Sequence, residues 1–373
     1  MKFIVEANIL SAAMKRVSGV IETKSTIPIL TNVMITADKA SKTVTLCGTD
    51  LDIEVSVELP ALVEFKGGLT TSAHLLEAYV GKTPKGAQLL LESDGGHMTC
   101  QQGRSSVRMQ TLPVEDYPTF QSGDMPFTFV MTATEFGKLL GDVRVSISTE
   151  ETRYYLNGVY LHPRNNAVGA PGISACSTDG HRLSLAHHPM PDPRIQEYPG
   201  IIVPRKTVLL LMKLCDGQDS VSVAYSQSKI SADFGKVKVI SKLIDGTFPD
   251  YERVIPRGNN AIATINRAAM SAAVDRVTTI SSDKGRATKL SFEGNKLVIG
   301  CNDPDRGSAV EEMDIGYEAD PLEIGFNSKY VLDMLGSYDG DELNFAISDP
   351  GSPVIIQKPG DPNRMSVLMP MRV

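Results

Sequence analysis

The motif TDGHRLSL at residues 178–185 holds the side chains best suited to chemistry. Asp179, His181 and Arg182 lie at a glycine-containing turn, and Cys176 precedes them. A hydrolytic enzyme would use such a set as nucleophile, base and orienting acid. Two other interpretations need no catalysis. The turn could bind a partner, or it could be a structural surface turn whose side chains only form hydrogen bonds within the chain.

Related turns elsewhere in the chain argue against catalysis. TDLD (49–52) and NDPD (302–305) keep an acid but lack the histidine and the arginine. An aspartate shared by three turns is typical of turn chemistry, in which its carboxylate accepts hydrogen bonds from nearby backbone amides. We therefore favour partner binding at His181 and Arg182, and we predict no catalytic residue.

Motifs for metals and cofactors are also absent from the sequence. His187 and His188 are adjacent, so on a strand they point to opposite faces. No HExxH, CxxC, GxGxxG or GxxxxGK[ST] pattern occurs. We therefore expect neither a metal site nor a cofactor.

The chain repeats itself three times. Short strands lead into helices at FIVEANILSAAMKRV (3–17), FVMTATEFGKLLGDV (129–143) and ATINRAAMSAAVDRV (263–277). A second helix signal recurs at 70–81, 202–214 and 325–336, in each case beginning with Ser, Pro or Asn. Such a pattern predicts an α+β fold of three repeated two-layer domains, with helices on one face of antiparallel sheets.

Domain joints follow from composition and from the repeat. The segments 120–127 and 254–261 contain glycine and proline. We place the domains at 1–123, 124–256 and 257–373. The apolar ending VLMP (367–370) stands where LPVEDYP (112–118) and LIDGTFP (243–249) end the earlier repeats. The tail is therefore predicted to be the last strand of the third domain.

Composition limits the class of protein. The 373 residues carry a net charge of −7, which argues against coating nucleic acid with the whole surface. Five scattered cysteines and no recognisable signal peptide predict reduced thiols in a cytoplasmic protein. Basic residues recur on the predicted helices, where they are either ordinary solvated side chains or one local positive surface for phosphate contact.

Several long motifs resemble the bacterial DNA sliding clamp, the beta subunit of DNA polymerase III. They are MKFIVEANIL, STIPILTNVMI, RYYLNGVYL, STDGHRLSL, VPRK, LIDGTFPDYERVIP and VLMPMRV. The resemblance covers the whole chain. It implies a homodimeric ring, the DNA clamp fold, that encircles duplex DNA without sequence specificity and has no catalytic activity. It also implies that polymerase subunits and an ATP-driven clamp loader attach through short peptides, as expected of a processivity factor in DNA replication.

The resemblance also implies three sets of site residues. A peptide pocket between the second and third domains would use Leu156, Thr178, Gly180, His181, Arg182, Leu183, Pro249, Arg253, Val254, Val367, Leu368, Met369, Pro370, Met371 and Arg372. DNA would contact Lys24, His74, Arg153, Tyr154, Tyr155, Arg205 and Lys206. The dimer would join Arg104, Val107 and Met109 of one chain to Thr279, Ile280 and Glu311 of the other.

The sequence departs from the family pattern at two positions, and two alternatives to a ring-shaped clamp are open. His74 stands where a stronger cation is expected, and Glu150 where a polar DNA-facing residue would fit. One alternative is an enzyme that uses Asp179 and His181. The other is a monomeric adaptor that uses the pocket without closing a ring.

Overall fold

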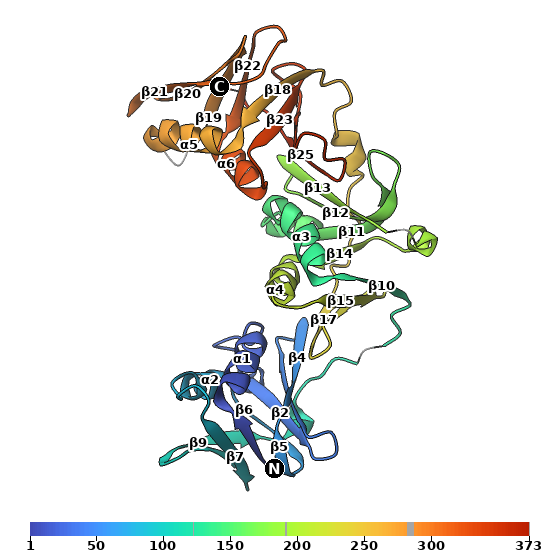
Figure 1. Ribbon diagram of the computed structural model, residues 1–373, viewed down its shortest axis with the longest axis vertical. Helices are drawn as coiled ribbons and strands as arrows, with labels where there is room; N and C mark the ends of the chain where they lie inside the picture. Colours follow the sequence, from blue (N-terminus) through green and yellow to red (C-terminus); the bar gives the residue numbers. More distant parts are fainter. Residues whose placement is uncertain (122, 191, 282–286, 373) are drawn as a thin grey trace. The chain divides into compact units, whose positions relative to one another are not determined.

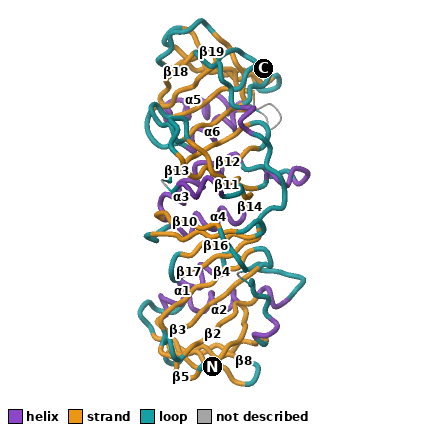
Figure 2. The backbone as a smooth tube through the Cα atoms, turned by 90° about the vertical axis from the view of Figure 1, so that its right-hand side faces the viewer, coloured by secondary structure: helices purple, strands orange, loops and turns teal. Residues whose placement is uncertain are grey.

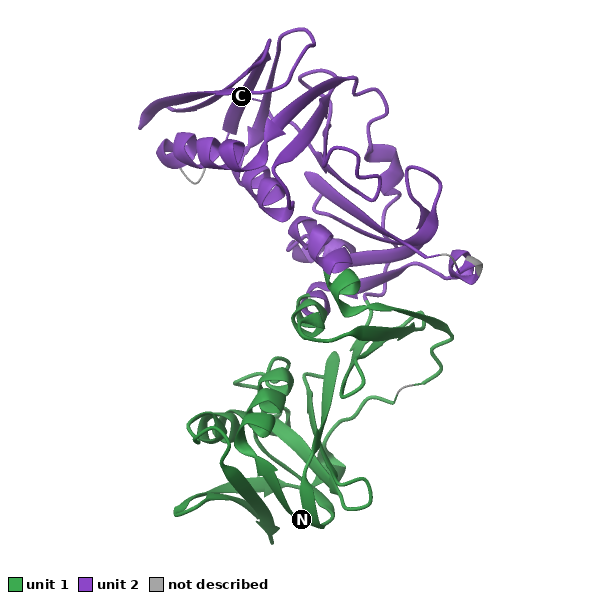
Figure 3. Cartoon of the chain, viewed as in Figure 1, with its two compact units in different colours: residues 1–137, 209–243 green, residues 138–208, 244–373 purple. Residues whose placement is uncertain are grey.

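The computed structural model describes residues 1–121, 123–190, 192–281 and 287–372. Ser122 in the first predicted joint and Val373 at the end of the tail motif therefore lie outside the described residues. The chain is divided into two compact units (Figure 3). Unit 1 comprises Met1–Gly137 and Leu209–Leu243, and unit 2 comprises Lys138–Val208 and Ile244–Val373.

Unit 1 is built on one antiparallel sheet of 13 strands. Hydrogen-bonded neighbours follow the order β10 (Phe127–Thr132), β15 (Ser220–Tyr225), β16 (Lys229–Asp233), β17 (Val237–Lys242), β4 (Ile53–Pro60), β3 (Thr43–Thr49), β2 (Asn32–Asp38), β6 (Gly67–Ser72), β9 (Ser105–Leu112), β8 (His97–Gln102), β7 (Gln88–Asp94), β1 (Lys2–Glu6) and β5 (Leu62–Phe65). The pairing of β17 with β4 joins strands nearly two hundred residues apart into one sheet.

Helices α1 (Ala7–Val17) and α2 (Ala73–Gly81) lie side by side in unit 1 (Figures 1 and 2). Leu10, Met14 and Val17 are buried on one face of α1, while Lys15 is exposed. This spacing of apolar residues is the reason that the helix packs against β3 and β4.

Unit 2 contains two antiparallel sheets. The first has eight strands in the order β14 (Ile201–Pro204), β11 (Gly158–Asn165), β12 (Pro171–Thr178), β13 (Arg182–Pro189), β25 (Arg364–Leu368), β24 (Val354–Gln357), β23 (Glu342–Ile347) and β18 (Ala261–Asn266). The second has four, in the order β21 (Gly307–Asp314), β20 (Lys296–Asp303), β19 (Ala287–Glu293) and β22 (Leu322–Asn327).

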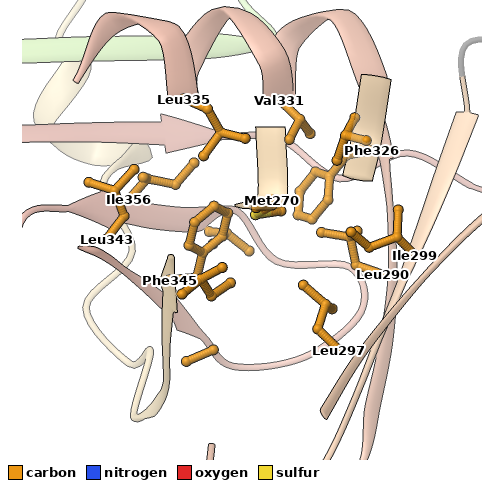
Figure 4. Close-up of a cluster of buried hydrophobic side chains, with 14 of the residues drawn as sticks. Met270, Leu290, Leu297, Ile299, Phe326, Val331, Leu335, Leu343, Phe345 and Ile356 are labelled. Atoms are coloured by element: carbon orange, nitrogen blue, oxygen red, sulfur yellow. The ribbon is translucent and has the colours of Figure 1, made fainter. Parts of the chain in front are cut away.

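Helices α5 (Arg267–Val277) and α6 (Ser328–Ser337) pack together in unit 2. Figure 4 shows their contribution to the core, where Met270 of α5 and Leu335 of α6 lie among side chains of the strands, including Phe345 and Leu290. All four of these side chains are fully buried. The two remaining helices, α3 (Ala133–Val143) and α4 (Arg205–Cys215), each pass from one unit into the other.

The predicted repeat is confirmed. All six expected helices form, and a strand precedes each of them directly. Ser72 and Asn327 cap α2 and α6 by accepting hydrogen bonds from Leu75 and Lys329 backbone amides. The predicted last strand forms as β25, which pairs with β13 and β24. Within the described residues, no helix combines the length and the apolar character needed to cross a membrane.

Candidate functional site

A pocket of about 300 Å³ lies within unit 2. Segments far apart in the sequence converge on it: the 3-10 helix Glu151–Leu156, the turn between β12 and β13, the 3-10 helix Tyr251–Val254, and the end of β25. The lining residues are Arg153, Tyr155, Leu156, Thr178, Gly180, Arg182, Leu183, Pro249, Asp250, Tyr251, Val254, Val367 and Met369.

The base of the pocket is apolar and fixed. Leu156, Leu183 and Val367 are 4%, 2% and 2% exposed and belong to one buried cluster with Phe248 and Tyr251. Leu183 and Val367 are direct partners across β13 and β25, so the pairing of these two strands sets their spacing. A preformed apolar floor favours binding of apolar side chains.

The β12–β13 turn has its shape because of Asp179. Its Oδ1 accepts hydrogen bonds from the backbone amides of His181 and Arg182, at 2.9 and 3.0 Å. Asp50 and Asp303 make the same pair of bonds to residues two and three positions later in their own turns. The prediction that the shared aspartate is turn chemistry is therefore confirmed.

Gly180 is required at this turn. Its φ is +89°, a conformation that other residues rarely adopt, and a Cβ there would lie 2.6 Å from the Arg153 guanidinium. The glycine therefore permits both the tight turn and the close approach of Arg153 to the pocket.

Arg182 is held in place on all sides. Its Nε donates to Asp179 at 3.0 Å, its Nη1 to Asp333 at 2.7 Å, and its guanidinium carbon lies 4.4 Å from the centre of the Tyr330 ring. The side chain is only 9% exposed. Because two carboxylates balance its charge, Arg182 shapes the wall of the pocket more than it attracts an acidic ligand.

Two further arginines near the pocket are also paired within the chain. Arg153 donates to Glu150 at 2.8 Å, and Arg253 lies 2.8 Å from Asp250. The Glu150 carboxylate, a departure from the family pattern, therefore serves as the partner of Arg153. The pocket thus has an apolar base and a rim of balanced charges.

Aromatic rings support the pocket from beneath. Tyr251 lines it, and its hydroxyl bonds to His162 Nε2 at 2.8 Å. His162 stacks on Tyr160 with ring centres 4.5 Å apart, and Tyr160 stacks on Phe248 at 4.9 Å. Burial, as the main cause, lowers the pKa of His162 to about 4, and also lowers that of His187 on β13 to about 4.

We expect unit 2 to lose stability as the pH falls from 7 to 5. The folded pKa of His162 lies below its ordinary value of 6.5, so the unfolded chain binds the proton first. Stability is full above pH 6.5 and falls as the pH drops toward 4, by about 1–2 kcal/mol at pH 5 for His162 alone. Urea unfolding followed by circular dichroism at both pH values measures this. His162→Gln should make the dependence shallower and leave the share that comes from His187, and an equally steep dependence in that variant would contradict the assignment.

Most of the pocket residues expected from the sequence come together here. The nine that line the pocket are Leu156, Thr178, Gly180, Arg182, Leu183, Pro249, Val254, Val367 and Met369. The six that do not are His181, Arg253, Leu368, Pro370, Met371 and Arg372. Leu368 differs from expectation for a clear reason: successive residues of β25 face opposite ways, so Leu368 is fully buried in the neighbouring core while Val367 faces the pocket.

Four lining residues were not among the expected pocket residues. Asp250 and Tyr251 belong to the FPDYERV motif, so their neighbours in that motif already gave the signal. Arg153 and Tyr155 were expected at DNA, and here they line the pocket. Sequence spacing could not have found this, because the 3-10 helix that contains them has an irregular backbone at Arg153.

The remaining residues expected at DNA lie in both units. In unit 1, Lys24 is exposed in the segment after α1, and His74 is half-buried on α2. In unit 2, Tyr154 is 54% exposed, and Arg205 and Lys206 are exposed at the start of α4. Their contact with DNA stays a prediction.

The residues expected at the dimer contact differ in exposure. Arg104 is exposed and Val107 half-buried in unit 1, but Met109 is 4% exposed. Met109 therefore packs in the core of its own unit because β9 turns it inward, and it offers little surface to a partner. In unit 2, Thr279 donates to the Asp275 carbonyl oxygen and Ile280 is partly buried.

Glu311, the acidic residue expected at this contact, already has a partner. Arg276 Nε donates to its carboxylate at 3.0 Å, and this hydrogen bond is the main cause that lowers the pKa of Glu311. An ion pair within the chain weakens the case for Glu311 as the main ionic contact of a dimer.

The arrangement does not support the alternative of an enzyme. Both Asp179 oxygens are occupied by the turn and by Arg182. Cys176 is fully buried, and burial raises the pKa of its thiol well above the ordinary value, so a thiolate nucleophile is disfavoured.

Comparisons with known proteins agree across the whole chain. Family models of the DNA polymerase III beta subunit match in order: its N-terminal domain at residues 1–121, its central domain at 131–250 and its C-terminal domain at 252–372. A beta sliding clamp of Caulobacter vibrioides is 39% identical over 376 residues, and that of Escherichia coli is 31% identical over 377. All of this chain and all of each relative are covered.

A solved structure gives the same result. The sliding clamp from Bartonella birtlesii, bound to griselimycin, aligns with a TM-score of 0.95 at 40% identity and covers 100% of both chains. The repeated two-layer domains and the three matching family domains define a three-domain clamp. The chain belongs to the family of DNA polymerase III beta subunits, the bacterial beta sliding clamps. Members of this class are homodimeric, non-catalytic processivity factors that act with the polymerase on DNA.

Proposed function

We propose that the pocket in unit 2 is where DNA polymerase subunits and the clamp loader attach, each through a short peptide. The observation that carries this proposal is the apolar base of Leu156, Leu183 and Val367 beneath an open rim. An apolar peptide side chain would fill it, and the partly exposed Met369 and Val254 would close around that side chain. Met371, Pro370 and Arg372, which follow the pocket wall, are proposed to contact residues further along the peptide.

The proposal extends to DNA. Lys24, Arg205 and Lys206 are exposed cations on an acidic chain, which suits phosphate contact without base recognition. Tyr154 is proposed to lie against the sugar-phosphate backbone. Such phosphate contacts are weak and partly mediated by water, so they permit sliding along the DNA. The closed ring, and not tight binding, would then keep the protein on the DNA.

The proposed dimer contact uses two open strand edges. Among the residues that the structure describes, 105–110 of β9 pair with β8 alone, and β21 pairs with β20 alone. An open edge can accept a strand of another chain through backbone hydrogen bonds. We propose that β9 of one protomer meets β21 of its partner, with Val107 and Ile280 as the apolar part. The proposed domain limits are 1–123, 124–256 and 257–373, and the proposed location is the cytoplasm.

Retention on DNA is expected to depend on the topology of the DNA. Direct phosphate binding weakens steeply with salt, whereas a closed ring on a nicked circle cannot leave by dissociating from phosphates. The protein is loaded onto a nicked circle by a clamp loader, washed with high salt, and measured by gel filtration before and after the circle is cut. We expect retention on the circle and loss after cutting. Equal loss from circular and linear DNA would contradict encirclement.

A charge at the proposed dimer contact is expected to separate the protomers. Val107→Asp places a carboxylate in the apolar part of the contact, where it would be desolvated without a partner. Sedimentation should then report monomers at micromolar concentration, while the parent chain is a dimer. The matched control is Val130→Asp on β10, an edge strand in the same sheet whose Val130 is 63% exposed. A dimer that survives Val107→Asp, or a parent chain that is monomeric, would count against this contact.

A further inference from the structure

The exposed methionines of this protein are concentrated at one place. All fifteen methionines of the sequence lie in the described ranges, and only Met369 and Met371 among them are exposed, at 40% and 41%. Met14, Met270 and Met334, for comparison, are fully buried in the cores of the two units. Of the other methionines, seven are half-buried and six are buried. Since oxidants reach exposed side chains first, we expect the two tail methionines to react first.

The cysteines do not compete for an oxidant. All five are free and buried. Burial raises the pKa of Cys100 to about 12 and that of Cys215 to about 11, so their reactive thiolate forms are scarce. The thioethers in the tail are therefore the sulfur groups on which oxidation chemistry would begin.

Met369 differs from Met371 in its position. Met369 lines the pocket, and its backbone amide donates to the His181 carbonyl oxygen at 2.9 Å, which fixes the residue beside the β12–β13 turn. Met371 follows two residues later, outside the lining, with its amide bonded to the Gly325 carbonyl oxygen at 2.8 Å. One of the two exposed methionines is thus part of the pocket wall.

We propose that Met369 is a reversible oxidation site that controls peptide binding at the pocket. This inference rests on the proposed function of that pocket. The oxidant is a two-electron peroxide such as hydrogen peroxide: the sulfur lone pair takes one oxygen atom, the O–O bond breaks, and water leaves. Methionine sulfoxide is the product, and the methionine sulfoxide reductases reverse the step.

The sulfoxide changes the pocket because it is polar. Its oxygen is a strong hydrogen-bond acceptor. Val367, Val254 and Leu156 in the lining offer it no donor. The guanidinium groups of Arg153 and Arg182, which do carry donors, are already paired with Glu150, Asp179 and Asp333. Before a peptide binds, water satisfies the oxygen. A bound apolar side chain would exclude that water, and so we expect peptide affinity to fall roughly tenfold or more.

The experiment measures binding of a fluorescent polymerase-derived peptide to the full-length dimer before and after treatment with hydrogen peroxide. Peptide mapping by mass spectrometry locates the added oxygen. We expect oxidation first at Met369 and Met371, no oxidation of Met270 or Met334, weaker peptide binding, and recovery after treatment with reductase. Sedimentation should report an unchanged dimer, because the proposed dimer contact lies on other segments.

Two matched variants separate the two exposed methionines. Met369→Leu keeps the apolar volume without sulfur, so its peptide affinity, whatever the untreated value, should be the same before and after peroxide. Met371→Leu should stay sensitive. Unchanged affinity after full oxidation of Met369, or sensitivity that follows Met371, would overturn the inference. Failure of the untreated parent chain to bind any peptide would instead overturn the proposed function of the pocket.

Discussion

The double variant Met369→Ala, Val254→Ala is expected to bind a polymerase-derived peptide more than tenfold more weakly than the parent chain. Both side chains line the pocket, and both are partly exposed, at 40% and 50%. Truncating each removes apolar contact with the peptide at a cost of about 1 kcal/mol or more, and about 1.4 kcal/mol is a factor of ten in affinity. Fluorescence anisotropy measures the change.

The fold should survive this double substitution because neither side chain belongs to a buried core. Val168→Ala is the matched control: Val168 is also in unit 2, is 74% exposed and lies outside the pocket lining. That variant should bind peptide normally. Equal peptide affinity in the double variant and in the Val168 variant, with the dimer intact, would refute the assignment of the pocket and leave the ring untouched.

Arg364→Met is expected to destabilise unit 2 by about 3 kcal/mol, because it breaks a buried ion pair and leaves Asp142 with the more exposed Lys138, at 3.2 Å, as its cation. Arg364 is 6% exposed at the start of β25. Its Nη1 lies 2.9 Å from Asp142, its Nη2 donates to the Ser337 carbonyl oxygen at 2.7 Å, and its guanidinium carbon lies 3.8 Å from the centre of the Tyr338 ring. Urea unfolding measures the loss.

This network has consequences for the site because Arg364 lies on the strand that supplies Val367 to the pocket. Burial is the main cause that raises the pKa of Asp142, and the nearby Arg364 cation acts in the opposite direction. The charged form of this buried carboxylate is therefore stabilised by Arg364. In the double variant Arg364→Met, Asp142→Leu the buried carboxylate is removed together with its buried cation, and Lys138 keeps its contact with Asp339 at 3.6 Å, so stability should partly return. Lys242→Met, which breaks an exposed pair with Asp52, is the control and should change stability little. Similar losses from the buried and the exposed pair would contradict this account.

The repeat and its helices could be predicted from the sequence because their causes are local. Apolar residues at helical spacing, such as Leu10 and Met14, identify the helices, and the preceding cap residues identify where they begin. The role of Asp179 was also predictable, since a carboxylate bonds the amides two and three residues later wherever such a turn forms. The family followed from long motifs that cover the whole chain.

The tertiary structure alone decided which side chains form the pocket. The motif VLMPMRV predicted both Val367 and Leu368 at the pocket, but the pairing of β25 with β13 turns Leu368 into the core. Met109 on β9 is buried for the same kind of reason. Sequence spacing shows only that successive side chains of a strand alternate between its two faces. Which of the two faces is buried depends on the elements that pack against the strand.

Charge pairing was the other property that the sequence could not give. Arg153 meets Glu150 close by in the chain, but Arg182 meets Asp333 and Arg364 meets Asp142 across more than 150 residues. Their partners are brought near by the pairing of β13 with β25 and by the packing of α6, because contacts between distant segments form only when the chain has folded. The sequence by itself determined the repeated elements and the family, and the fold determined which of their side chains meet at the pocket.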